Sequence, residues 1–183
     1  CGGNGPDEGF DCDGNSLQTT LSVDLGTGWS WFSSNIVVED ASIGAIVPAD
    51  GAVETVISQT GYTQYYDYSG GTWYPSDFFF DVTKTYVAFS NAESSIEITG
   101  DEVDVASTPI SLSTSWNWIS YLPQVAWDVD NAFSNVNFTH EDMLMTQIQF
   151  TTYYAGWGWY PGATEGFMLY PGDGLKLFVA EES

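Results

Sequence analysis

The side chains most often used in catalysis are scarce in this sequence. His140 is the only histidine, and it lies in the run Thr139–Asp142. A His-Glu-x-x-His zinc site needs a second histidine at position 144, where this chain has Leu144. A serine nucleophile would depend on the same histidine, and the chain has no Gly-x-Ser-x-Gly turn. Two of the 25 acids would suffice for glycoside hydrolysis, but nothing singles out a pair. We therefore predict no enzymatic activity and interpret His140 as a solvated loop residue.

Oxygen ligands are spaced for a cation near the start of the chain. Asp11, Asp13 and Asn15 alternate, and Gly14 allows a tight turn between them. This pattern is the first half of an EF-hand-like Ca²⁺ loop, because Ca²⁺ prefers several oxygens from a flexible loop. The acid expected at position twelve of such a loop falls on Ser22. The sequence thus offers a candidate calcium site, with a plain acidic linker as the alternative.

Two aromatic rows form the other candidate site. Tyr and Trp faces stack on sugar rings, and exposed aromatic rings also occur where protein subunits associate. The first row is Tyr62, Tyr65, Tyr66, Tyr68, Trp73 and Tyr74, and the second is Tyr153, Tyr154, Trp157, Trp159 and Tyr160. Side chains alternate in a strand, so half of each row is expected to point inward. A glycan platform, an association surface and a structural core all stay open as interpretations.

The two cysteines, Cys1 and Cys12, both lie near the start of the chain. They are close enough to form a disulfide, which an oxidising exterior allows. A Cys1 followed by a Gly-rich stretch also resembles a mature bacterial lipoprotein, in which that cysteine carries the lipid. A third interpretation is a chain boundary made by proteolysis. We expect contact with a membrane only through such a lipid on Cys1.

The charge balance is strongly acidic, with 25 Asp and Glu against two Lys and a formal net charge of −23. Such a surface repels nucleic-acid phosphates and anionic lipid headgroups, so we exclude these as partners. The composition favours an extracellular protein that charge keeps soluble. Its expected partners are copies of itself, other surface proteins or glycans, with Ca²⁺ as the only candidate cofactor.

The sequence repeats itself with a period of about 87 residues. Trp29-Ser-Trp31 returns as Trp116-Asn-Trp118, and further landmarks return in the same order. These landmarks are Gln59 and Gln147, Tyr65-Tyr66 and Tyr153-Tyr154, Trp73-Tyr74-Pro75 and Trp159-Tyr160-Pro161, and Tyr86–Phe89 and Leu175–Phe178. We divide the chain into an N-terminal tether (1–16), a first repeat (17–92), a linker hairpin (93–105) and a second repeat (106–183).

Inside each repeat the hydrophobic period is two, and Val, Ile, Thr, Tyr and Trp are abundant. Alternating stretches precede both Trp-x-Trp motifs, at 21–25 and 110–112. Helical turns are expected only at 126–136 and at the equivalent 42–47 or 51–57. The sequence therefore predicts an all-β protein, with two pseudo-equivalent β repeats, sandwich or barrel-like, packed in tandem.

The unit of Trp-x-Trp, Gln, Tyr-Tyr, Trp and Pro-Gly-x-Gly resembles an aromatic-rich β repeat of large secreted and cell-surface bacterial proteins. The likeness covers most of 17–180 and is best in the second repeat, whereas 81–84 replace the Pro-Gly-x-Gly turn in the first. The run 10–15 resembles the acidic joints between modules of such proteins. The resemblance implies a structural or adhesive module on the cell surface.

We expect a non-catalytic extracellular module that is structural or adhesive. In one version it is a filament subunit, whose residues 1–16 and strand 17–25 complete the sheet of the next copy. The alternative is a carbohydrate-binding module that uses the aromatic rows.

Overall fold

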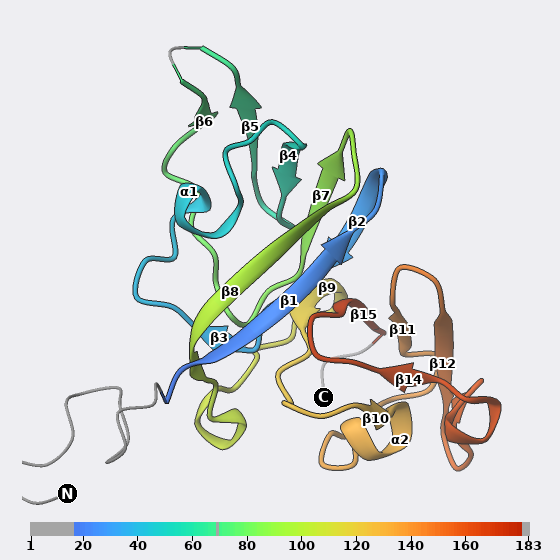
Figure 1. Ribbon diagram of the computed structural model, residues 1–183. Coiled ribbons are helices and arrows are strands. Elements are labelled where there is room, and N and C mark those ends of the chain that lie inside the picture. Colours follow the sequence, from blue (N-terminus) through green and yellow to red (C-terminus); the bar gives the residue numbers. More distant parts are fainter. Residues whose placement is uncertain (1–16, 69, 181–183) are drawn as a thin grey trace, which may run out of the picture.

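The computed structural model describes residues 17–68 and 70–180, and strands dominate it (Figure 1). The predicted all-β class is confirmed. Both α-helices are single turns, α1 (Ile43–Ile46) and α2 (Val129–Ala132), inside segments where helical turns were predicted. The sheets are open, so the barrel alternative is wrong. The candidate calcium loop, Cys1 and Cys12 lie outside the described residues.

The strands fall into two groups along the chain, which we call the first and second halves. The first half contains β1 (Thr19–Leu25), β2 (Gly28–Phe32), β3 (Ile36–Val37), β4 (Val53–Ile57), β5 (Tyr62–Tyr66), β6 (Thr72–Tyr74), β7 (Tyr86–Ser90) and β8 (Ser94–Glu102). The second half contains β9 (Ser115–Ser120), β10 (Trp127–Asp128), β11 (Met143–Met145), β12 (Phe150–Tyr154), β13 (Gly158–Tyr160), β14 (Met168–Leu169) and β15 (Gly174–Val179). Short 3₁₀ turns occur at Val105–Ser107 and Ala163–Glu165.

Each half has one five-stranded antiparallel sheet, and the two sheets follow the same order. The order is β2-β7-β4-β5-β6 in the first half and β9-β15-β11-β12-β13 in the second. Each Trp-x-Trp motif forms an edge strand, and each Tyr-Tyr segment pairs with the Trp-Tyr segment that follows it. The repeated landmarks of the sequence therefore occupy matching strands.

The halves differ in what covers these sheets. In the first half, a sheet of order β1-β8-β3 packs on the five-stranded sheet, with Leu25, Phe32, Ile96 and Ile98 in the shared core. The second half shows only the short pair β10-β14 beside its large sheet among the described residues. The alternating stretch 110–112 forms no strand, which corrects its expected equivalence with 21–25.

The predicted linker hairpin at 93–105 is wrong, because most of this segment is the single strand β8. Ile96 and Ile98 are buried and face the core, and β8 pairs with β1 on one side and β3 on the other. Gly100 lies inside this strand and allows a close approach of β3, since a Cβ there would lie 2.1 Å from the carbonyl oxygen of Val37.

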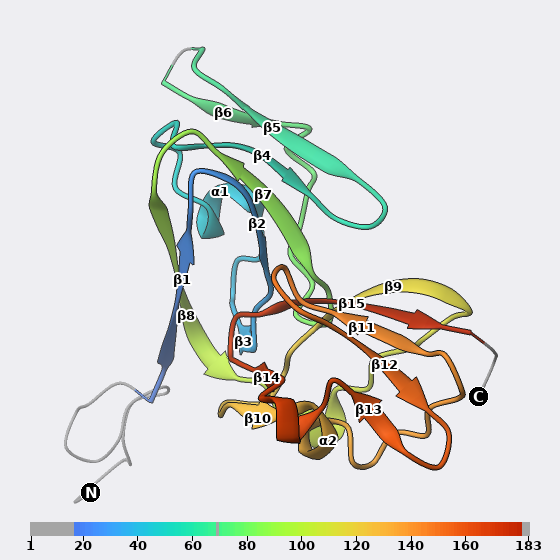
Figure 2. The same cartoon turned by 90° about the vertical axis from the view of Figure 1, so that its right-hand side faces the viewer.

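The two halves meet along β2, β9 and β15, and they exchange matching contacts (Figure 2). The side chain of Gln147 accepts from Trp31 N–H (2.7 Å) and donates to Trp29 C=O (2.9 Å). The side chain of Gln59 accepts from Trp118 N–H (2.8 Å) and donates to the carbonyl oxygen of Trp116 (2.7 Å). Each glutamine thus takes the place of a strand at the edge of the other half's sheet. We call this contact the junction.

Further contacts across the junction show the same reciprocity. Single β-bridges join Phe32 to Asp173 and Lys84 to Ile119. The buried hydroxyl of Thr85 donates to the carbonyl oxygen of Ile119 and accepts from Leu175 N–H (2.7 Å). These bonds satisfy backbone groups that would otherwise be buried without partners.

Two charged groups lie at the junction. The Lys176 ammonium sits 3.7 Å from the ring centroids of both Trp31 and Trp118, in cation–π contact with one ring from each half. Burial there lowers the pKa of Lys176. Burial also raises the pKa of Asp173, although its carboxylate accepts a hydrogen bond from Tyr170 N–H (2.8 Å).

Gln147→Ala should lower the free energy of unfolding by about 1–2 kcal/mol, because two backbone groups of β2 lose their partner at the junction. Urea unfolding at pH 7 measures this loss. Gln149→Ala is the matched control, since that side chain is exposed and makes no hydrogen bond with the described residues, and it should change stability by less than about 0.5 kcal/mol. Equal effects of the two substitutions would contradict the role of Gln147.

Asp173→Asn should stabilise the protein at pH 7, because the amide keeps an acceptor oxygen without the poorly solvated charge. A carboxyl with a raised native pKa binds its proton more tightly in the native state. The stabilising contribution of the Asp173 carboxyl is therefore complete below pH 3.8, its ordinary pKa, and is lost as pH rises through its raised native pKa. The advantage of Asp173→Asn should accordingly disappear below pH 3.8. Unfolding curves of the variant, the wild type and Asp24→Asn, an exposed charge control, test this dependence.

Candidate ligand-binding site

The second half carries an exposed aromatic surface at the β12–β13 hairpin. Tyr154, Trp157 and Tyr160, together with His140, line an open hollow of about 470 Å³. The Trp157 side chain is 92% exposed, and Tyr160 and Tyr154 are also exposed. We call these four residues the second platform.

The strand register explains why these rings face outward. Thr152 pairs with Tyr160 and Tyr153 pairs with Trp159, so Tyr154 and Tyr160 share one face while Tyr153 and Trp159 share the other. The inward rings pack edge to face with centroids 5.5 Å apart, and Trp159 is buried in the core. A buried aromatic layer therefore supports the exposed one.

Trp157 is presented by the turn that joins the two strands. Its N–H donates to the carbonyl oxygen of Tyr154 (2.8 Å), and Gly156 adopts a positive φ of 84° that a glycine tolerates without strain. The ring of Trp157 thus projects from the hairpin tip.

His140 braces the same hairpin from a distant segment. Its Nδ1 accepts from Ala155 N–H (3.4 Å), and its ring lies edge to face on Tyr154, with centroids 5.7 Å apart. His140 is exposed and lies in a turn, as the sequence interpretation expected, but its contacts with the hairpin were not predicted, because local sequence does not show which segments lie side by side. His140 is the part of the platform that sequence reasoning did not find.

The backbone that follows Tyr160 is held by two carboxylates. Gly162 N–H donates to Glu165 (2.8 Å) and Ala163 N–H donates to Asp130 (3.0 Å). The hydrogen bond from Gly162 is the main reason that the pKa of Glu165 is lowered. These bonds fix the chain direction after β13 and therefore the position of Tyr160.

Alternation splits the eight aromatic residues predicted as ligand or interface groups into two sets. Tyr66, Tyr74, Tyr154 and Trp157 are exposed, whereas Tyr65, Trp73, Tyr153 and Trp159 lie wholly or partly buried beneath them. The exposed set falls on two separate hairpins, β5–β6 and β12–β13. The structure therefore brings together the members of each row but not the two rows.

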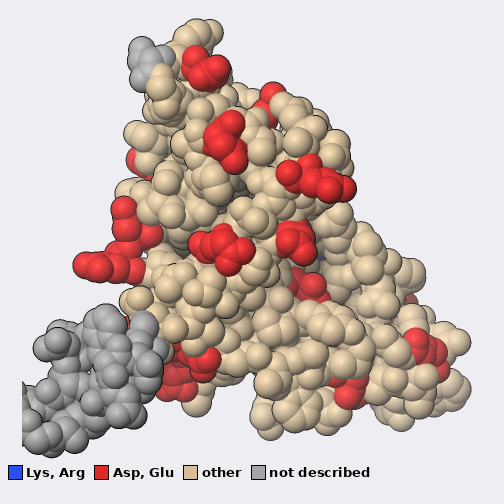
Figure 3. All heavy atoms as spheres, in the orientation of Figure 1, with Lys and Arg blue, Asp and Glu red and all other residues tan. Residues whose placement is uncertain are grey.

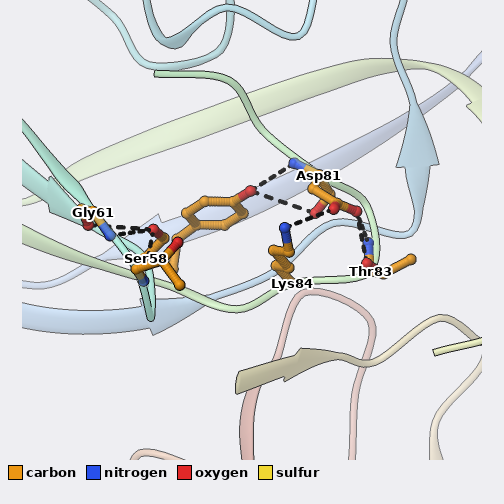
Figure 4. Close-up of polar contacts among 7 residues, drawn as sticks. Ser58, Gly61, Asp81, Thr83 and Lys84 are labelled. Atoms are coloured by element: carbon orange, nitrogen blue, oxygen red, sulfur yellow. Dashed lines mark hydrogen bonds and ion pairs between the residues drawn. The ribbon is translucent and has the colours of Figure 1, made fainter. Parts of the chain in front are cut away.

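Carboxylates are scattered over the visible face of the molecule (Figure 3). Both lysines are engaged away from the second platform. Lys176 lies at the junction, and Lys84 forms an ion pair with Asp81 (3.0 Å) in a turn that Thr83 also caps (Figure 4). Burial opposes ionisation of Asp81, but hydrogen bonds from Thr83 and Lys84 outweigh it and lower its pKa. The second platform is thus aromatic and has no lysine beside it.

Metal-ligating clusters and membrane-spanning helices are both absent from the described residues. Within residues 17–68 and 70–180, no three His, Cys, Asp or Glu side chains are grouped to hold a metal ion. In the same part of the chain, no helix has the length and apolar character needed to cross a membrane.

Comparison with known proteins gives no relative: no family model, no curated protein and no solved structure matches this chain. What the chain binds must therefore be inferred from its own geometry.

Proposed function

We propose that this chain is a non-catalytic extracellular adhesive module that binds neutral carbohydrate on the second platform. The observation that carries the proposal is the set of exposed rings around one hollow, with Trp157 almost fully exposed at its rim. Clustered exposed aromatic rings are costly in water and are typical of binding surfaces. A surface of this kind needs a partner that covers it.

A sugar ring fits the chemistry of this surface. One face of a pyranose carries mainly C–H groups, which pack on an indole or phenol ring. Tyr154, Tyr160 and His140 line the hollow and carry hydroxyl and imidazole groups, which can form hydrogen bonds with sugar hydroxyls. The combination of apolar walls with a few polar atoms is typical of small-ligand sites.

The negative charge of the protein favours neutral glycans over anionic ones. With a net charge of −23 and no lysine beside the second platform, an anionic polysaccharide would be repelled at long range and would find no lysine partner at contact. A neutral glycan meets neither penalty. We therefore assign neutral polysaccharides as the ligand class.

Two features support a module that holds rather than transforms its ligand. His140 contacts a backbone N–H and a tyrosine ring, which orient it as a brace of the hairpin. The junction holds the two halves through reciprocal hydrogen bonds, and this suits a protein that carries load between surfaces.

The filament hypothesis stays a prediction, and the structure adds a cost to it. β1 pairs along all seven residues with β8 of its own chain, and Val23 and Leu25 are buried in the first core. Donating this strand to another copy would first break that ladder. The adhesive proposal requires no such exchange.

Trp157→Ala should weaken binding to neutral polysaccharides about tenfold or more, because the indole is the largest exposed ring at the hollow and would carry much of the contact. Affinity electrophoresis through gels that contain β-glucan, xyloglucan or galactomannan measures the loss, with alginate as the anionic comparison. Trp127→Ala is the matched control, since Trp127 is 45% exposed but lies on β10, outside the second platform. Wild-type retardation by alginate alone, or equal losses in both variants, would contradict the proposal.

A further inference from the structure

The first half presents a second set of exposed rings, at the β5–β6 hairpin. Tyr68 is 74% exposed, Tyr74 is 69% exposed and Tyr66 is 37% exposed. The rings of Tyr66 and Tyr68 stack nearly parallel, with centroids 6.1 Å apart and planes inclined by only 14°. We call Tyr66, Tyr68 and Tyr74 the first platform.

The two platforms are built in the same way. Gln64 pairs with Tyr74 on β5–β6 as Thr152 pairs with Tyr160 on β12–β13, so the two tyrosines occupy matching outward positions. Beneath the first platform, Tyr65 and Trp73 pack edge to face at 5.6 Å. The second platform rests on the equivalent inward pair at 5.5 Å. A shared strand register and support layer thus recur at both hairpins.

The two platforms lie at opposite ends of the molecule. Both views place the β5–β6 hairpin at the top and the β12–β13 hairpin at the bottom, with the junction between them (Figures 1 and 2). Hydrogen bonds from Gln59 and Gln147 join the halves there. Because the halves are joined in this way, the platforms cannot turn toward each other to grip one short oligosaccharide.

We propose that the chain is bivalent: each platform binds its own neutral glycan chain, and one molecule bridges two of them. This inference rests on the proposed function of the second platform and adds a second site and a consequence, cross-linking. Linked sites that engage separate chains of one material gain avidity without any new contact.

The two sites should differ in strength. The second platform includes an indole and a hollow, whereas the first platform consists of three phenol rings. Tryptophan contributes more contact area than tyrosine, so the second platform is the stronger site.

Calorimetric titration with cellohexaose and with chitohexaose tests the site number. The wild type should show two sites per chain for whichever sugar binds. Tyr68→Ala with Tyr74→Ala should leave one stronger site, and Trp157→Ala with Tyr160→Ala should leave one weaker site. Because all four side chains are exposed, thermal unfolding of both variants should match the wild type.

Flocculation of cellulose or chitin particles tests bridging in the same samples. The wild type and the control Trp127→Ala should aggregate the particles, while each platform variant should still bind them without aggregation. One site in the wild type, lost entirely in the Trp157→Ala, Tyr160→Ala variant, would overturn bivalency and leave the proposed function intact. No binding to either sugar or to either particle would overturn both.

Discussion

The structure depends on two glutamine side chains that each complete the sheet edge of the opposite half. An edge strand leaves a row of N–H and C=O groups without partners in its own sheet, and these groups can recruit another chain. Gln147 satisfies one pair on β2, and Gln59 satisfies the equivalent pair on β9. Each half thus supplies a glutamine side chain that bonds the edge strand of the other half. This exchange fixes how the two five-stranded sheets lie relative to each other.

The junction also explains part of the unusual aromatic content. Trp31 and Trp118 hold the Lys176 ammonium between them, one ring from each half. Such a contact is strengthened by removal from water, and lowering of the lysine pKa records that removal. In a protein with so few cations, this partly buried lysine between two indoles ties the halves together.

Much of the fold could be predicted from local pattern. Alternation of apolar and polar residues identified the strands, and it also indicated that half of each aromatic row would point inward, as Trp73 and Trp159 do. The recurrence of Gln59 and Gln147 was visible, but their role was not, because it requires contacts between residues more than fifty positions apart. The contact of His140 with the backbone of Ala155 was likewise not predicted, because it also joins residues that are not local in the sequence.

The wrong prediction of a hairpin at 93–105 has a physical reason. Gly100-Asp101 has the composition of a turn, and turn chemistry usually outweighs two apolar residues on each side. Here Ile96 and Ile98 bury themselves between two sheets, and the glycine is required by the close passage of β3. Tertiary packing therefore makes this segment the central strand of a sheet instead of a hairpin. The second half has no such strand among the described residues and covers its core with irregular chain.

The glutamine exchange has a consequence for solubility at high concentration. β2 and β9 are edge strands rich in aromatic residues, the type of segment that readily recruits a strand from a neighbouring molecule and seeds insoluble aggregates. A side-chain amide already occupies each of these edges, and unlike a full strand it offers no further row of backbone groups for elongation. The same contact that joins the halves thus blocks one edge of each five-stranded sheet, at β2 and at β9, against strand addition.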